Sequence, residues 1–175
     1  MQYRELNVNE INLELFKNFR RHQAIKQCLR KIDGKWCLVD VEFTEDWNEE
    51  NYSELIACLK NTITTKGIVI GAFSNEILKG FMSVEPVLFG TNKEYLDLSS
   101  IHVSEDVRGK GIGKELFQKA KSWAKAHGAK KLYISAHSAA ESQAFYHAMG
   151  CCEAEEYSQF YVEKEPYDCQ LECKL

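Results

Sequence analysis

Three glycines stand at every second position in the segment VRGKGIGKEL, residues 107–116, among basic side chains. Glycine lets an anion approach the backbone closely and permits dihedral angles that other residues avoid. The first N–H groups of a helix lack internal partners and carry partial positive charge. Helix-forming residues follow directly, so the segment predicts a phosphate cradle at the start of a helix. The glycines are Gly109, Gly111 and Gly113, and the basic residues are Arg108, Lys110 and Lys114.

The spacing does not match the two commonest nucleotide-binding loops. A P-loop requires G-x-x-x-x-G-K-[ST], but Gly109 to Gly113 is one residue too short and Glu115 replaces the magnesium-binding hydroxyl. The dinucleotide fingerprint G-x-G-x-x-G fails because Lys114 occupies the place of the third glycine. A mononucleotide-binding protein remains an alternative, which preferential binding of ATP or GTP would reveal.

Composition limits the classes of partner. The chain has 175 residues and a net charge of −4, which argues against a nucleic-acid partner. We expect a cytoplasmic protein with no membrane partner, because the sequence contains neither a signal-peptide core nor a run long enough to span a bilayer. Its seven cysteines, an odd number, indicate reduced thiols. We expect no metal, because no CxxC or HxxxH pair accompanies Cys169 and Cys173.

The first 66 residues predict one strand, two helices and, near residues 31–46, an extended insertion that matches no motif. Residues 3–6 indicate a short strand, and the broken apolar stripe of residues 10–29 predicts a helix. DGKW, residues 33–36, is typical of a turn, and WCLVDVEF, residues 36–43, is typical of an extended segment. Residues 44–63 predict a second helix, whose acidic first turn suits the positive end of the helix dipole.

The middle of the chain predicts a hairpin followed by an irregular strand. GIVIGAF (67–73) and ILKGFMSVE (77–85) are separated by three residues and predict an antiparallel hairpin. Residues 94–104 predict a further strand, in which the apolar residues change from even to odd positions. An extra residue near Ser99–Ser100, a β-bulge, would restore the alternation. A strand buried on both faces would explain the same pattern, and the sequence does not choose between them.

After the glycines, helices and strands alternate. An apolar stripe from Ile112 to His127 predicts a helix, residues 130–136 a strand, and residues 138–150 another helix. Residues 151–157 and 168–175 predict two closing strands. A helix between the strands at 94–104 and 130–136 implies that these two strands are parallel. Together with the hairpin, this predicts a mixed sheet in an α/β or α+β fold.

Two motifs resemble one enzyme family. Arg108-x-x-Gly111-x-Gly113, directly after a strand, resembles the acyl-CoA-binding motif of the GCN5-related N-acetyltransferases (the GNAT family). ESQAFYHAMGC, residues 141–151, is similar to the family segment built around Phe-Tyr. The resemblance covers about residues 94–152. It implies a mixed, mostly antiparallel sheet of six to seven strands, with a central parallel pair splayed at a β-bulge and about four flanking helices.

The resemblance also implies an organisation for the chain and a set of cofactor contacts. One domain would span residues 1–175, with an acceptor-side half at 1–93, an acyl-CoA-binding half at 94–152 and closing strands at 153–175. Many members carry an asparagine where Ala139 stands, so Ser138 or Ser142 is expected to contact the cofactor instead. Loop amides would hold the pyrophosphate of coenzyme A, and the strand edge would hold the pantetheine arm, with the Val103 N–H facing the thioester oxygen. The loop residues are Arg108, Gly109, Lys110, Gly111, Ile112, Gly113 and Lys114, and the edge residues are Ile101, His102 and Val103.

Acetyl transfer to an amine defines the remaining roles. A free amine has a pKa of about 10.4 and must lose a proton before it attacks. The departing sulfur, in contrast, benefits from gaining a proton. By resemblance, Tyr146 protonates or positions the sulfur; the alternative is a tyrosine packed beside Phe145. Candidate bases are Asp97, Glu85 and His137, each of which could instead be a solvated or structural polar residue. The side chain of His102 is expected to be packed or at the surface.

The segment VEFTEDWNEENY, residues 41–52, carries five acids together with Trp47 and Tyr52, and would suit a cationic acceptor. The alternative is a helix start that carries acids for dipole reasons. We predict an N-acetyltransferase that moves an acetyl group from acetyl-CoA to a primary amine of a small molecule, by direct attack in a ternary complex. The alternative is a non-catalytic acyl-CoA-binding module. The resemblance also makes a homodimer possible.

Overall fold

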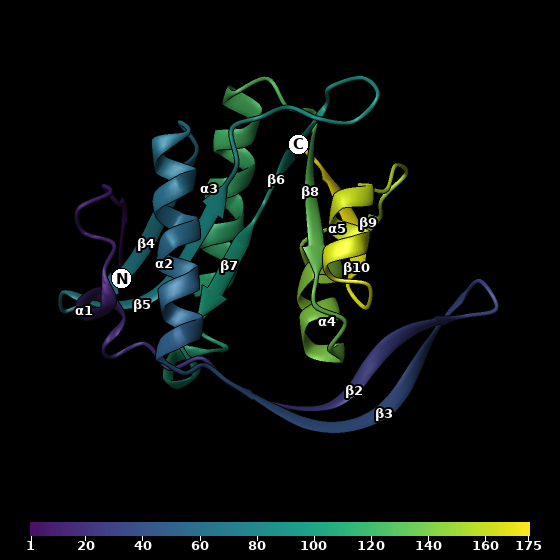
Figure 1. Ribbon diagram of the computed structural model, residues 1–175, viewed down its shortest axis with the longest axis horizontal. Coiled ribbons are helices and arrows are strands. Elements are labelled where there is room, and N and C mark those ends of the chain that lie inside the picture. The colour runs from purple at the N-terminus through teal and green to yellow at the C-terminus, as the bar shows by residue number, and fades with distance from the viewer.

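The computed structural model describes all residues from 1 to 175 and contains two four-stranded sheets that diverge, together with a long separate hairpin (Figure 1). The first sheet has the order β1-β4-β5-β7, the second β6-β8-β10-β9, and β2 pairs with β3. The strands are β1 Gln2–Glu5, β2 His22–Ile32, β3 Lys35–Asp46, β4 Ile68–Ser74, β5 Ile77–Val84, β6 Tyr95–Asp97, β7 Ser100–Val103, β8 Lys131–Ala136, β9 Cys152–Glu153 and β10 Cys169–Lys174. The helices are α1 Leu13–Phe16, α2 Glu49–Thr64, α3 Ile112–Ala126, α4 Ala140–Ala148 and α5 Gln159–Lys164.

The expected α+β fold with one parallel strand pair is confirmed. β6 and β8 run parallel, and every other strand pairing is antiparallel. The predicted hairpin is confirmed as β4 and β5, which are joined through Asn75 and Glu76, both at positive φ. The structure has ten strands and five α-helices, more than the six to seven strands and four helices expected, because the insertion forms its own hairpin and α5 was missed.

The change of alternation predicted within residues 94–104 is an interruption of the strand. At its end, β6 is bonded on both sides: the Glu85 N–H donates to the Asp97 carbonyl at 2.9 Å, and the Leu98 N–H donates to the Tyr133 carbonyl at 2.9 Å. Beyond Ser99 the chain pairs with β5 only, as β7. We call the Asp97–Leu98 position the vertex, because the two sheets diverge from it. Residues 95–98 are buried on both faces, as one of the two alternatives expects, but the strand is not continuous and residues 100–103 are only half-buried.

Helices cover both faces of the first sheet (Figure 1). The even-numbered residues of β4, such as Ile68 and Ile70, pack in one core cluster with the apolar side of α3. The odd-numbered residues, such as Val69 and Phe73, pack in a second cluster with α1 and α2. This arrangement places the start of α3, which follows the glycine segment, beside the end of β7.

The helix expected over residues 10–29 is wrong. Only α1 is helical there, and from His22 the chain pairs with β3 along an 11-residue strand. The turn predicted at residues 33–36 is confirmed and closes this hairpin at Asp33 and Gly34, both at positive φ. Pairing with a partner strand outweighs helix propensity, which is only a weak preference. The helix expected over 44–63 begins later, at Glu49, because β3 continues to Asp46 and Asn48 caps the helix.

The C-terminal prediction is right in part. The closing strand at 168–175 is confirmed as β10, which lies between β8 and β9. The strand expected at 151–157 is reduced to the two residues of β9, and the chain then forms the short α5. No helix of the structure combines the length and the apolar character needed to cross a membrane.

Candidate active site

The glycine segment forms an open loop between β7 and α3. Gly109 and Gly111 have φ of 76° and 79°, in the left-handed region, and a Cβ at either position would meet no atom within 4 Å. Gly111 is the N-cap of α3, and no side chain caps the first N–H groups of that helix. The exposed side chains of Lys110 and Lys114 form no ion pair. Free amides and cations therefore share one surface that an anion can reach.

The third glycine and its neighbour Ile112 have packing roles. A Cβ at Gly113 would lie 3.2 Å from a ring carbon of Phe145, so this glycine permits close contact between α3 and α4. Ile112 is buried at 4% exposure in the larger core cluster, which leaves only its backbone for the loop. The loop is thereby held beside the helix that carries Tyr146.

One edge of β7 has no strand partner. β7 pairs with β5, and the Ser104 N–H continues this pairing by donating to the Lys79 carbonyl at 2.9 Å. Because N–H groups alternate in direction along an antiparallel strand, those of Ile101 and Val103 point away from β5. β8, which pairs with β6, does not reach them. The Val103 carbonyl accepts a bond from Nε of Arg108 at 3.2 Å, so the edge runs directly into the loop.

The side chain of His102 is packed and not at the surface, which were its two expected placements. Its ring lies 4.8 Å from that of Trp47 and 5.2 Å from that of Phe81. Burial, with the charge of Arg21, lowers the pKa of His102 to about 3. The imidazole is therefore neutral at ordinary pH, and the His102 backbone faces β5, so this residue offers no free N–H at the open edge.

Tyr146 is 9% exposed, and its ring packs against those of Phe117 and Phe145. The ring is therefore packed beside Phe145, as the alternative interpretation expects. The hydroxyl makes no hydrogen bond within the protein and remains free to act on the sulfur. Burial raises the pKa of Tyr146, with smaller contributions from Cys151, Asp168 and Asp97. The phenol therefore stays protonated and can donate to a group from outside the protein.

The two candidate carboxylates meet at the vertex. Asp97 is 3% exposed, and its Oδ2 accepts a hydrogen bond from the Tyr161 hydroxyl at 2.5 Å. Oε1 of Glu85 accepts bonds from Thr62 at 2.5 Å and from Ser99 at 3.0 Å. Burial and, to a smaller extent, the Glu85 charge raise the pKa of Asp97 to about 7, although the Tyr161 bond and the Lys164 charge oppose them. A carboxyl group that titrates near neutral pH is suited to exchange protons with a substrate.

The raised pKa predicts how Asp97→Asn changes stability with pH. Folded Asp97 keeps its proton up to about pH 7, whereas the unfolded chain releases it near about pH 3.9. The folded state binds more protons in this window, so the Asp97 contribution to stability is present below pH 4 and is lost as pH rises through 7. Relative to the wild type, Asp97→Asn should therefore gain about 2–4 kcal/mol between pH 4 and pH 8.

Urea unfolding of both proteins at several pH values measures this difference. Asp40→Asn makes the same chemical change at an exposed position and serves as the control. Parallel stability curves for the wild type and Asp97→Asn would show that the vertex does not perturb this carboxyl.

The other polar candidates serve the hairpin β2–β3. Nε2 of His137 lies 3.0 Å from Oε1 of Glu45, whose Oε2 lies 2.6 Å from a guanidinium nitrogen of Arg21. The His137 hydrogen bond, with Arg21, lowers the pKa of Glu45 to about 2. Ser138 is buried, and its hydroxyl accepts a bond from Arg30 at 2.6 Å. His137 and the expected cofactor contact Ser138 thus hold the hairpin in place.

The hairpin β2–β3 connects the end of β7 in the first sheet to the end of β8 in the second, and it crosses below both strands in Figure 1. At its base, the Glu105 N–H donates to the Arg20 carbonyl at 2.9 Å, just after β7. Further along, the Leu29 N–H donates to the Ser138 carbonyl at 2.8 Å, just after β8. The hairpin is therefore a strap that ties the two sheets together on one side, and the unassigned insertion near residues 31–46 forms its turn and its second strand.

The acidic aromatic segment at residues 41–52 does not form a free wall. Glu45 is paired as described, and Trp47 packs against Tyr52 and His102. Glu49 and Glu50 lie in the first turn of α2, where acids favour the helix dipole. These contacts favour the alternative interpretation of the segment, namely a helix start preceded by a paired carboxylate.

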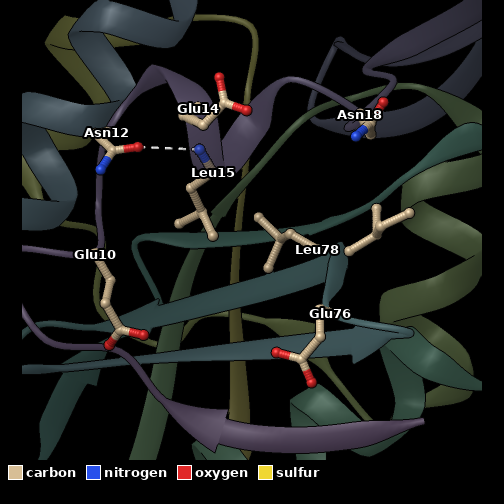
Figure 2. Close-up of a pocket in the computed structure, with 8 residues that line it drawn as sticks. Glu10, Asn12, Glu14, Leu15, Asn18, Glu76 and Leu78 are labelled. Carbon is tan, nitrogen blue, oxygen red and sulfur yellow. Dashed lines mark hydrogen bonds between the residues drawn. The ribbon is translucent and has the colours of Figure 1, made fainter.

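A separate hollow of about 370 Å³ lies near α1 and the β4–β5 turn (Figure 2). It is lined by the carboxylates of Glu10, Glu14 and Glu76. Arg4 already pairs with Glu10 at 2.7 Å, and Lys17 pairs with Glu14 at 3.2 Å. None of the glycine loop, the β7 edge and the vertex lines this hollow. No group of three or more His, Cys, Asp or Glu side chains could hold a metal ion.

Sequence reasoning missed the groups that hold the two carboxylates. Thr62, Ser99 and Tyr161 come from α2, from the interruption after β6 and from α5. No local signal identifies them, because each contacts a residue far away in the chain. The alternation change near Ser99 was the one usable sign, and it pointed to the vertex itself.

Comparison with known proteins defines the class. The model of the acetyltransferase (GNAT) family matches residues 35–151, well over half of the chain. The chain therefore belongs to the GNAT family of acetyltransferases, and by class it is an acetyl-CoA-dependent N-acetyltransferase. No curated protein sequence matches it.

Solved structures share the fold over nearly their whole length. Nourseothricin acetyltransferase is similar with a TM-score of 0.73 at 17% identity, over 99% of this chain and 97% of that one. A Bacillus anthracis str. Ames protein assigned as a streptothricin acetyltransferase, solved with acetyl coenzyme A, gives 0.72 at 19% identity over 99% and 98%. The paia N-acetyltransferase from Thermoplasma acidophilum, solved with coenzyme A, gives 0.60 at 14% identity over 99% and 98%.

Proposed function

We propose that this chain transfers the acetyl group of acetyl-CoA to a primary amine of a small molecule, by direct attack in a ternary complex. The observation that carries the proposal is one continuous path. The open glycine loop leads into the unpaired edge of β7, and that strand begins next to two carboxylates at the vertex. A bound thioester and an incoming amine would meet where this edge ends.

The loop and the strand edge fit coenzyme A. The diphosphate would lie on the free amides at the start of α3, where the glycines leave open space and Lys110 and Lys114 add positive charge. The outward backbone groups of Ile101 and Val103 would hold the pantetheine arm, whereas those of the expected contact His102 face β5. When bound, acetyl-CoA supplies an activated thioester. Because the arm would run from the loop toward the vertex, the outward N–H of Ile101, which is nearer the vertex than that of Val103, would stabilise negative charge on the carbonyl oxygen.

Proton transfer is assigned to three side chains. Asp97, whose pKa near 7 lets it accept a proton at neutral pH, would take the proton of the acceptor ammonium. Glu85 would assist by keeping negative charge at the vertex. Tyr146 would donate its free hydroxyl proton toward the sulfur that leaves. His137 is left out of this set because its ring is bonded to Glu45.

A small-molecule acceptor is supported by two observations. Structures similar over their full length include acetyltransferases named for nourseothricin and streptothricin. The vertex also holds two carboxylates, Asp97 and Glu85, without a direct ion pair to any basic side chain. Such a pair favours a cationic group as its partner.

A thiol-release assay with acetyl-CoA and a panel of amines tests the proposal. The panel includes diamines, streptothricin-type and aminoglycoside-type antibiotics, amino-acid amides and a lysine peptide. We expect turnover with at least one small amine, well above acetyl-CoA hydrolysis without acceptor. The non-catalytic alternative predicts that calorimetry detects acetyl-CoA binding while every amine stays unmodified, and turnover of the peptide alone would contradict the small-molecule assignment.

A further inference from the structure

One hydrogen bond links the C-terminal helix α5 to the vertex. The Tyr161 hydroxyl donates to Oδ2 of Asp97 at 2.5 Å, across 64 residues of chain. The other oxygen of Asp97, Oδ1, receives no hydrogen bond, and it is not among the polar atoms closed off from solvent without a partner. Tyr161 thus occupies one side of the carboxylate and leaves the other available.

The fold holds the Tyr161 hydroxyl in a defined place. The Ser158 N–H, at the start of α5, donates to the Tyr133 hydroxyl at 2.9 Å, and that hydroxyl is also bonded to Gln170 at 2.5 Å. The rings of Tyr133 and Tyr161 are stacked, with centroids 5.6 Å apart. A short helix of six residues is therefore docked on Tyr133 of β8 by a hydrogen bond and by ring stacking, and its docking aims Tyr161 at Asp97.

We propose that Tyr161 is a positioning residue for acetyl transfer: its hydroxyl fixes Oδ2 of Asp97 and favours the ionised carboxylate, so that Oδ1 faces the acceptor. This inference rests on the proposed function. In the step it serves, an N–H bond of the acceptor ammonium breaks and an O–H bond forms at Oδ1. The nitrogen keeps the electron pair with which it then attacks the thioester.

Five titratable groups surround Asp97, and they separate the effect of Tyr161 from the rest. Burial and the Glu85 charge raise the pKa of Asp97, whereas the Tyr161 bond and Lys164 lower it. Asp97 in turn raises the pKa of Tyr133 and Tyr146, after the larger effect of their burial. Tyr161→Phe removes one stabilising bond to the carboxylate and leaves the other groups in place. The pKa of Asp97 should therefore rise in this variant.

The pH dependence of kcat/KM provides the test. We expect the rising limb near pH 7 to move upward by about one pH unit in Tyr161→Phe, which corresponds to an about 10-fold loss at pH 6 and near-complete recovery at pH 9. Tyr157→Phe is the matched control, since it removes a hydroxyl that is bonded to the exposed Glu153 in the same part of the chain. That variant should keep the wild-type limb. An unmoved limb in Tyr161→Phe would overturn the inference.

A titration of the Asp97 side-chain carbonyl by carbon-13 NMR, assigned with Asp97→Asn, gives a readout independent of activity. The Asp97 titration should move to higher pH in Tyr161→Phe and stay unchanged in Tyr157→Phe. If the titration moves but no amine is acetylated, the proposed function fails while the effect of Tyr161 on Asp97 holds. If amines are acetylated and the titration does not move, Tyr161 is only a packing residue and the inference fails.

Discussion

Tyr146→Phe is expected to lower kcat by about 100-fold or more while leaving the affinity for acetyl-CoA unchanged, because a positioned general acid contributes on that order. The hydroxyl is bonded to no protein group, and burial raises its pKa, so it remains protonated at neutral pH. Its ring packs on Phe117 and Phe145, and phenylalanine keeps these contacts. The loss should therefore appear in the chemical step and not in the fold.

Steady-state kinetics with a saturating amine measures kcat, and calorimetry measures acetyl-CoA binding. Tyr3→Phe removes another tyrosine hydroxyl, on β1 at the far edge of the first sheet, and should keep wild-type kcat. A kcat within two-fold of the wild type in Tyr146→Phe would remove this tyrosine from the mechanism and leave the sulfur to be protonated by solvent.

The parts of the site that could be predicted are those whose conformation is determined by neighbouring residues. Gly109 and Gly111 need left-handed dihedrals that only glycine adopts freely, so their spacing predicted an open loop. The change of alternation after Leu98 indicated that the strand is either irregular at this point or buried on both faces, because side chains along a strand alternate between two faces. Both features were found where the sequence indicated.

The parts that could not be predicted depend on distant partners. Residues 22–32 have no strong strand pattern of their own, and their extended form comes from pairing with β3 and docking on the segment after β8. Ser138 was assigned to the cofactor from its place in a motif, but its hydroxyl is bonded to Arg30, 108 residues away. A local motif can identify the start of a helix, but it does not show which side chains there are hydrogen-bonded to a distant segment of the chain.

The proposed base, Asp97, is an intermediate case. Asp97 was a candidate from its position before the irregularity, but its pKa near 7 results from burial beneath α5, which was not foreseen. The same burial implies a cost in stability at neutral pH, as the Asp97→Asn prediction states. A carboxyl group with a lowered pKa would instead stabilise the fold at neutral pH, but it would be a weaker base than Asp97.

Gly111→Asp is expected to weaken acetyl-CoA binding by about 100-fold or more. At φ of 79° a side chain costs about 1–2 kcal/mol, and its carboxylate would project into the open space beside the first amides of α3. Repulsion from a diphosphate adds about 4 kcal/mol for two unit charges 4 Å apart near a protein surface. Calorimetric titration with acetyl-CoA at low and high salt measures both the loss and its electrostatic share.

Two matched variants separate charge from backbone strain. Gly111→Asn has nearly the same shape without the charge and should lose much less affinity than Gly111→Asp, with little dependence on salt. Gly128→Asp places the same carboxylate at φ of 86° with equally open space, but at the opposite end of α3. It carries similar backbone strain, should be less stable than Gly111→Asp because its carboxylate lies at the negative end of the helix dipole, and should bind acetyl-CoA like the wild type. Equal affinities for Gly111→Asp and Gly128→Asp would mean that the diphosphate does not bind at the start of α3.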